Sequence, residues 1–214
     1  MRKVVFVIDG WFMRKQIQRY KTFYYSGPEI RKYCIRHLRA DDYLYRIFYY
    51  DTEPLDKKGH YPISKKTVDF GTTRVAMEQT KLLNSIKKTP NFALRLGETI
   101  WRNNQWILSQ DKVGQLLKKE ITIDQLTDDD FKPLIQQKAV DIKIGLDIAC
   151  IAIERLSDLL IIITGDADIV PVLKFARRNG MQVCLDPLRN PVRAELSEHV
   201  DFIETKIPAP KAKS

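Results

Sequence analysis

The sequence has few of the residues that build disulfide frameworks and zinc sites. Its three cysteines, Cys34, Cys150 and Cys184, are far apart in 214 residues, and no CxxC pair occurs. Isolated thiols at such spacing do not suggest a disulfide framework or a zinc site. Each lies in an apolar or helical stretch, where free cysteine behaves as a small core residue. We therefore expect a reduced, cytoplasmic protein.

Histidine and long apolar runs are also scarce. His37, His60 and His199 lie outside the acidic motifs described below, and no Ser/His or Cys/His arrangement accompanies them. This argues against cleavage chemistry based on histidine as acid or base. The apolar run in the N-terminal "MRKVVFVIDG" is too short for a signal peptide or a membrane span. We expect no membrane partner.

What the chain does have is positive charge and enough apolar residues for a core. Lys and Arg total 36 against 27 Asp and Glu, a net charge of +9, and 44% of the residues are hydrophobic. A basic surface favours polyanions, so nucleic acid is the first partner to consider. The alternative from charge alone is simply a soluble basic protein.

Continuous β-branched and aromatic runs predict strands buried on both faces of a parallel sheet. Intervening segments have helical spacing of their apolar residues. The predicted strands are Lys3–Asp9, Asp42–Asp51, 158–166 and Met181–Asp186, and a hairpin is predicted from 93–101 and 105–109. The predicted helices are 27–40, 73–88, 112–120, 140–153 and 169–180. This alternation predicts an α/β fold, a three-layer α/β/α sandwich with a mainly parallel sheet.

The chain is expected to form one domain over residues 1–205. The long and less regular segment 54–137 is interpreted as an elaboration inserted into that domain. The Pro/Lys-rich end, 206–214, is predicted to be a basic disordered tail.

Aspartates stand where the predicted strands end. Asp9 ends the first strand, and in "IIITGDADIVPVL" Asp166 and Asp168 follow another. Ligands of open parallel sheets bind at the carboxyl ends of the strands. Carboxylates crowded there repel one another and normally need a cation, and an oxygen-only ligand set selects Mg²⁺ or Mn²⁺ over zinc.

A helix supplies two further acids. In "KAVDIKIGLDIACIAI", Asp141 stands at the beginning of the predicted helix and Asp147 interrupts its apolar middle. A carboxylate in such surroundings is costly unless a cation or hydrogen-bond donors satisfy it. We predict that this partner is the metal, helped by Lys143 one helical turn away.

Structural roles are the alternatives for most of these acids. Asp166 or Asp168 would serve as the N-cap of the helix that follows, and Asp141 as the cap of its own helix. Asp9, followed by Gly10, would form only a turn. Capping does not explain Asp147.

Three motifs in order resemble the NYN domain, a branch of the PIN-like nuclease superfamily. They are "FVIDG", "KAVDIKIGLDIA" and "TGDADIVPVL". They are similar to motifs of bacterial single-domain NYN proteins, which have the forms K-G-V-D-V-x-L-x-x-D and S-G-D-x-D-F-x-P. The resemblance extends from Val4 to about Ile203 and is weakest in the insertion.

The resemblance implies a divalent-metal-dependent ribonuclease whose metal-binding and catalytic acids are Asp9, Asp141, Asp147, Asp166 and Asp168. Ala139, Thr164 and Ile169 replace the family's usual Gly, Ser and Phe, which are mild changes. The asparagine that the family has two or three residues after its first aspartate is missing here. That departure affects the positioning of substrate more than the binding of metal.

Cations and an aromatic residue near these motifs are candidate contacts for RNA. They are Lys138, Lys143, Arg14, Lys15 and Trp11. Lysines would face phosphates, and Trp11 with its neighbour Phe12 would stack on a base of single-stranded RNA. The alternatives are a solvated helix face for Lys143 and packing beneath the first helix for Trp11 and Phe12.

Three functions compete on this evidence. The leading one is an Mg²⁺- or Mn²⁺-dependent ribonuclease, and the second is an RNA-binding module of the same fold without cleavage, which the missing asparagine favours. A haloacid-dehalogenase type of phosphatase needs a second aspartate two residues after the first, where this chain has Trp11. A homo-oligomer is compatible with the sequence.

Overall fold

The structure, a computed structural model, describes residues 1–20 and 23–207. It has two compact units. The core unit comprises Met1–Thr52, Lys81–Gly97 and Ala139–Ser214, and the inserted unit comprises Glu53–Thr80 and Glu98–Lys138. Strand β5 (Phe92–Leu108) and helix α3 (Arg74–Lys87) have residues in both units. The tail predicted to be disordered lies outside the described residues from position 208 onward, and the single domain with an insertion stays a prediction.

A parallel sheet forms the middle of the core unit. Its strands follow the order β5-β2-β1-β7-β8-β9, and each of these neighbouring pairs is parallel. Strand β1 lies inside the sheet, between β2 and β7. Its five apolar residues, Val4 to Ile8, are fully buried, as expected for a strand covered on both faces. The strands are β1 (Arg2–Asp9), β2 (Asp42–Thr52), β7 (Leu159–Ile163), β8 (Gln182–Asp186), β9 (Phe202–Ile203) and the first part of β5.

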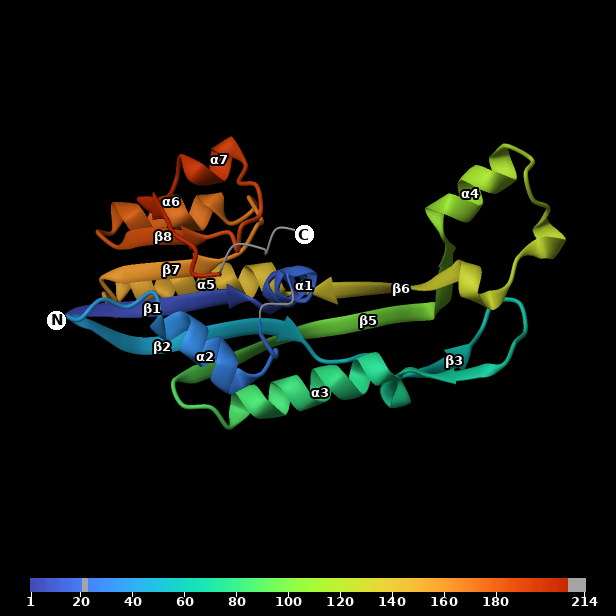
Figure 1. Cartoon of the computed structure of the whole chain (residues 1–214), viewed down its shortest axis with the longest axis horizontal. Helices are drawn as coiled ribbons and strands as arrows, with labels where there is room; N and C mark the ends of the chain where they lie inside the picture. Colours follow the sequence, from blue (N-terminus) through green and yellow to red (C-terminus); the bar gives the residue numbers. More distant parts are fainter. Residues whose placement is uncertain (21–22, 208–214) are drawn as a thin grey trace, which may run out of the picture. The chain divides into compact units, whose positions relative to one another are not determined.

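Helices cover both faces of this sheet (Figure 1). Alternate residues of β1 point to opposite faces, so Phe6 packs in one apolar cluster and Val7 in the other. The first cluster contains residues of α1 (Gly10–Tyr20), α2 (Gly27–Ile35) and α3. The second contains residues of α5 (Val140–Ile153), α6 (Val170–Arg178) and α7 (Ala194–Ser197). The predicted three-layer α/β/α sandwich with a mainly parallel sheet is confirmed.

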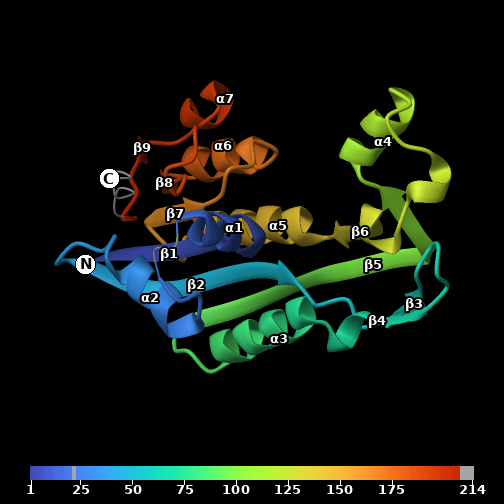
Figure 2. The same ribbon diagram turned by 45° about the vertical axis from the view of Figure 1, so that its right-hand side comes forward.

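The inserted unit is built on antiparallel pairs. The second part of β5 pairs with β6 (Phe131–Lys138), and β3 (Lys58–His60) pairs with β4 (Thr67–Asp69), both labelled in Figure 2. Its remaining elements are α4 (Gln110–Leu117) and the short 3-10 turns Phe70–Thr72, Ile123–Gln125 and Asp128–Asp130.

The predicted hairpin across residues 102–104 is wrong. Asn103 and Asn104 both have left-handed backbone, with φ of 54° and 53°. They form a bulge rather than a reversal, because β5 pairs with the same partner strand before the bulge (Trp101 with Ile135) and after it (Trp106 with Pro133). Asparagine tolerates this conformation better than most residues.

Two smaller expectations also change. Helix α2 ends at Ile35 instead of continuing to residue 40, because the next residues form i→i+3 hydrogen bonds, such as Leu38 N to Ile35 O at 3.1 Å. Cys34 and Cys184 are buried free thiols as expected, whereas Cys150 is exposed. None of the helices in the described ranges has the length and apolarity needed to cross a membrane.

Candidate active site

Three strands bring aspartates to the same edge of the core sheet. Asp9 is the last residue of β1 and pairs with Tyr50 of β2, so Asp51 stands one residue further along β2. On the other side of β1, Ile8 pairs with Ile163, the last residue of β7. Asp166 therefore follows β7 at the edge that Asp9 occupies.

Two glycines in the motifs are required by close packing. A Cβ on Gly10 would lie 2.5 Å from both the Tyr49 ring and the Tyr50 carbonyl oxygen. A Cβ on Gly165 would lie 2.6 Å from the ring of Phe12. Gly10 thus lets α1 approach β2 closely, and Gly165 lets the loop after β7 approach α1.

Asp9 uses one carboxylate oxygen to start α1. Its Oδ1 accepts a hydrogen bond from the backbone N–H of Phe12 at 3.0 Å, the contact expected of an N-cap. That contact occupies one of the two carboxylate oxygens, so the structural role and a role in a site are compatible.

The loop between β7 and α6 holds its two aspartates without making either one a helix cap. Thr164 Oγ1 accepts the N–H of Asp166 at 3.1 Å, and Asp166 Oδ1 accepts the N–H of Asp168 at 3.0 Å. Helix α6 has Ile169 at its N-cap and no side-chain cap. The capping interpretation of Asp166 and Asp168 is wrong, and Thr164 supplies the hydroxyl expected of the usual serine.

Asp141 is the second residue of α5 and does not cap it either. The N-cap is Ala139, which has a left-handed backbone (φ 67°) and makes no capping hydrogen bond. Partial burial raises the pKa of Asp141, and the charges of Asp166 and Asp168 raise it further. This exposed carboxylate of α5 therefore lies within electrostatic reach of the loop after β7.

Asp9, Asp51, Asp141, Asp166 and Asp168 form what we call the acidic cluster. Burial raises the pKa of Asp9 to about 6, and the charges of Asp141, Asp51 and Asp166 add to the shift. Burial also raises the pKa of Asp51, which Arg14 partly offsets. The pKa values of Asp9 and Asp141 are thus raised by other acids of the cluster, as expected of carboxylates that share a site.

The carboxylates of the acidic cluster do not converge on a single point. Within residues 1–20 and 23–207, no three Asp, Glu, His or Cys side chains are arranged to hold one metal ion. Oxygen donors of this kind nevertheless suit a hard cation such as Mg²⁺ or Mn²⁺. The donor chemistry fits such a cation, and the side chains would have to turn toward one another to hold it.

Asp147 has partners of its own. Its Oδ2 accepts hydrogen bonds from Arg95 Nε at 2.9 Å and from the hydroxyl of Tyr50 at 2.7 Å. Burial and the charge of Asp147 raise the pKa of Tyr50, which keeps that hydroxyl a donor. The structure thus joins Asp147 to β5 and β2, and Asp147 is not among the charges that raise the pKa of Asp9 or Asp141.

The predicted RNA contacts lie in different surroundings. Arg14 Nη2 lies 3.6 Å from Asp51 Oδ1, so it is a counter-charge of the acidic cluster. Lys143 donates a hydrogen bond to the backbone oxygen of Leu96. It therefore neither lies on a solvated helix face nor pairs with Asp147, the two roles that the sequence suggested. Lys138 is exposed at the end of β6 in the inserted unit.

Trp11 and Phe12 differ although they are neighbours. Phe12 is buried in the core, so it packs beneath the first helix and is not available to stack on a base. Trp11 is half exposed on the first turn of α1, and Lys15 Nζ lies 4.8 Å from its ring centroid. Trp11 and Lys15 together present an aromatic face and a cation to solvent.

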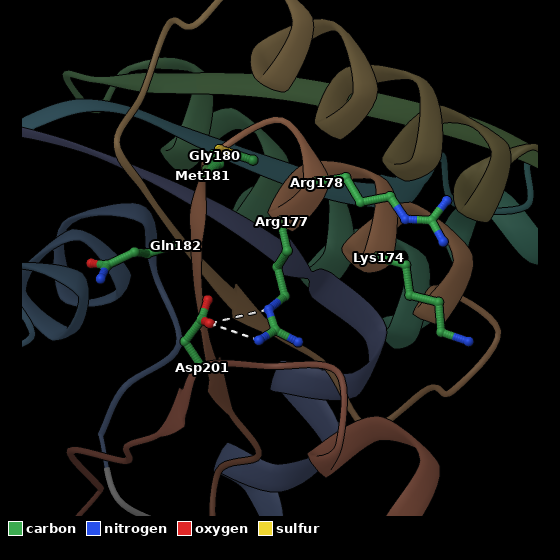
Figure 3. A pocket seen from close by; sticks show the side chains of 7 residues that line it. All are labelled: Lys174, Arg177, Arg178, Gly180, Met181, Gln182 and Asp201. Atoms are coloured by element: carbon green, nitrogen blue, oxygen red, sulfur yellow. Dashed lines mark hydrogen bonds and ion pairs between the residues drawn. The ribbon is translucent and has the colours of Figure 1, made fainter.

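A basic hollow lies at the opposite edge of the core sheet, where α6 ends and β8 begins (Figure 3). It has a volume of about 460 Å³ and contains Lys174, Arg177, Arg178 and Asp201. Arg177 binds Asp201 through two contacts of 2.9 and 3.1 Å, while Lys174 and Arg178 extend away from that acid. Basic residues at a helix C-terminus also stabilise the helix dipole, so the hollow has a structural explanation.

Sequence reasoning missed Asp51, Arg95 and Tyr50. Asp51 carried the same signal as Asp9, an aspartate at the end of an apolar strand. Arg95 lies 52 residues from Asp147 in the chain, and no local pattern marked it as the partner.

Comparisons with known proteins point to one family. The model of the family described as the NYN domain matches residues 77–200, more than half of the chain. That match contains four of the predicted acids, while Asp9 precedes it. No curated protein matches the chain. A solved structure from Vibrio parahaemolyticus, a protein of unknown function, aligns over 94% of this chain and 91% of its own at 12% identity, with a TM-score of 0.49.

Proposed function

The chain belongs to the NYN domain family, whose fold is of the nuclease type, and we propose that it is a divalent-metal-dependent ribonuclease. The observation that carries this proposal is the acidic cluster. Asp9, Asp51 and Asp166 come from three neighbouring strand ends, and burial and like charges raise the pKa of Asp9 to about 6. Such a concentration of negative charge is costly to the fold unless a cation binds there.

The proposed metal site consists of Asp9, Asp166, Asp141 and Asp168, with Mg²⁺ or Mn²⁺ as the ion. When bound, such a cation polarises a phosphate oxygen and lowers the pKa of a water molecule. Asp9 is held in place by its hydrogen bond to the α1 backbone, and Asp166 by its contacts in the loop after β7. Asp168 is exposed, so its carboxylate is accessible to a metal ion and to substrate from solvent.

RNA would meet cations and one aromatic ring beside the cluster. Trp11 is placed to stack on an unpaired base, and Lys15 beside it to contact a phosphate. Arg14 compensates Asp51 rather than substrate. Asp147 holds α5 against β5 and β2 through Arg95 and Tyr50, so we assign it the role of a positioning residue.

Cleavage of labelled single-stranded RNA by the purified chain tests the proposal. We expect cleavage in Mn²⁺, none in EDTA, and none from Asp9→Asn in either condition. Asp124→Asn is the matched control, because it removes the same charge from an exposed acid of the inserted unit. Equal cleavage by Asp9→Asn and the wild type would assign the activity to a contaminant.

A second function, RNA binding without cleavage, is favoured by two observations. The described acids do not converge on one ion position, and α1 lacks the asparagine that the family usually has. In that case the same RNA would bind in EDTA and remain intact in Mn²⁺.

A further inference from the structure

The inserted unit contains a pocket of its own, formed by residues of both its segments, Glu53–Thr80 and Glu98–Lys138. Its volume is about 410 Å³, within the range of small-ligand pockets. Side chains of both polar and aromatic kinds line it, and no acid is among them. Those that matter for its chemistry are Lys57, Lys58, His60, Trp101, Asn103 and Asn104.

The bulge in β5 shapes one wall of this pocket. Asn103 and Asn104 both adopt left-handed backbone, which is strained for residues other than glycine. The side chain of Asn104 stabilises this conformation by forming two hydrogen bonds with the backbone of His60. Its Oδ1 accepts from His60 N at 2.9 Å, and its Nδ2 donates to His60 O at 3.0 Å. Strand β3 is thereby fixed against the bulge.

Trp101 forms the floor of the pocket and is itself immobilised. It is 4% exposed, its Nε1 donates to Gln105 O at 2.7 Å, and its ring packs edge-on against Phe70 and Trp106. A Cβ on Gly59 would lie 2.3 Å from the Trp101 ring, so only glycine fits at that place in β3. The pocket is rigid before any ligand arrives, which lowers the entropic cost of binding.

Positive charge is concentrated at this pocket although the inserted unit as a whole is balanced. The unit contains eleven Lys and Arg residues and eleven Asp and Glu residues. Lys57 and Lys58 stand at the pocket, and both are exposed. Lys58 lies 3.6 Å from Asp69 while its side chain is 75% exposed, so this pair is weak and leaves the ammonium accessible.

We propose that this pocket binds one nucleotide unit of a single-stranded nucleic acid. Lys57 and Lys58 contact the phosphodiester oxygens. His60, whose backbone is fixed and whose side chain is exposed, stacks on the base, and the exposed amide of Asn103 pairs with the edge of that base. The pocket thus offers one group for each part of a nucleotide: lysines for the phosphate, an imidazole ring for the face of the base, and an amide for its edge.

Fluorescence anisotropy with a labelled oligouridine of about 12 nucleotides tests this proposal. The measurement uses the full chain with Asp9→Asn, in EDTA, so the result does not depend on metal or cleavage. We expect Lys57→Glu with Lys58→Glu to raise the Kd at least about tenfold. Loss of two phosphate contacts should also reduce the slope of log K against log salt by about 1.4.

His60→Ala separates stacking from charge. It should raise the Kd about tenfold and leave the salt slope unchanged, because a stacked base contributes without phosphate contacts. The matched control is Lys118→Glu with Lys119→Glu, the same charge change at the end of α4 in the same unit. Circular dichroism and thermal melts show whether each variant is folded.

Three outcomes would overturn the proposal. They are an absence of oligouridine binding by the parent chain, an equal loss of affinity in the control, and an unchanged affinity in folded pocket variants. Tighter binding of poly-glutamate than of oligouridine would assign the pocket to acidic peptides instead. Cleavage by the wild type is unaffected by these results, so this proposal and the proposed function fail separately.

Discussion

Two groups of aspartates in the core unit differ in what surrounds them. Asp147 and Asp186 each accept hydrogen bonds. The donors to Asp147 are Arg95 and Tyr50, and those to Asp186 are Tyr33 and the N–H of Leu188, with His37 Nε2 3.1 Å away. In the acidic cluster, the charges of neighbouring acids raise the pKa values of Asp9 and Asp141, and Arg14 lies beside Asp51. Burial alone therefore does not identify a functional carboxylate.

What distinguishes the two groups is compensation of charge. Removing one partner of a compensated buried acid destabilises the fold, because the other partner is left buried and unpaired. Acids whose nearest charges are other acids do the opposite, because they repel one another until a cation arrives. The contrast predicts opposite effects of neutralising an aspartate in the two groups.

The largest expected effect concerns cleavage. Asp166→Asn should reduce metal-dependent RNA cleavage on the order of a thousandfold, because the several kcal/mol that a metal contributes to the transition state depend on its ligands. Asp147→Asn should keep most of the activity. Initial rates of both variants in Mn²⁺ check this difference, and equal losses would place Asp147 in the same group as Asp166.

The next effect concerns the stability of the compensated group. Asp186 is fully buried at the end of β8, accepts from Tyr33 Oη at 2.5 Å and lies 3.1 Å from His37 Nε2. Asp186→Ala leaves these groups unpaired and should lower the free energy of unfolding by about 3–5 kcal/mol. Urea unfolding measures it. A loss below about 1 kcal/mol would contradict the distinction between the groups.

A pH profile tests the acidic cluster in the absence of metal. Because folding raises the pKa of Asp9 to about 6, its protonated form is favoured in the folded chain. The stability that this proton contributes is fully present below about pH 4 and is lost as the pH rises through about 6. In EDTA, the free energy of unfolding of Asp9→Asn should therefore equal that of the wild type near pH 4 and exceed it by up to about 3 kcal/mol at pH 7.5.

Urea unfolding of both proteins between pH 4 and 8 gives this difference directly. Asp124 is an exposed acid of the inserted unit, so the difference in free energy of unfolding between Asp124→Asn and the wild type should not change with pH over the same range. A flat difference for Asp9→Asn would remove the electrostatic basis of the acidic cluster.

The smallest effect is expected at Asp147. Asp147→Asn retains an acceptor for Tyr50 and loses the charge that faces Arg95, so it should lower stability by only about 1 kcal/mol. Its side chain is 25% exposed, which screens part of the interaction. The rise in melting temperature on addition of Mn²⁺ should be the same as in the wild type. Loss of that rise would make Asp147 a metal ligand, as the sequence suggested.

The parts that the sequence predicted are those with strong local signals. Strands β1 and β7 are continuous apolar runs, and the acids that follow them could be placed at one edge from the rule for parallel sheets alone. Asp51 followed the same rule and was overlooked. Strand β6 was missed because Pro133 and a polar half are untypical of strands.

The remaining errors concern contacts between distant segments. Whether residues 102–104 reverse the chain depends on the strand that pairs with β5, and β6 begins more than twenty residues later. The role of Asp147 likewise depends on Arg95, which β5 supplies from 52 residues away. The local spacing of apolar residues predicts neither the pairing of β6 with β5 nor the contact of Arg95 with Asp147.

Anomalous diffraction from a crystal soaked in Mn²⁺ tests most directly whether the acidic cluster is a metal site. The ion should appear between the carboxylates of Asp9, Asp166 and Asp141, with these side chains turned toward it, while the contacts of Asp147 with Arg95 and Tyr50 stay in place. A crystal at saturating Mn²⁺ with no peak at the acidic cluster, or with the ion bound by Asp147 in place of Arg95, would contradict this assignment.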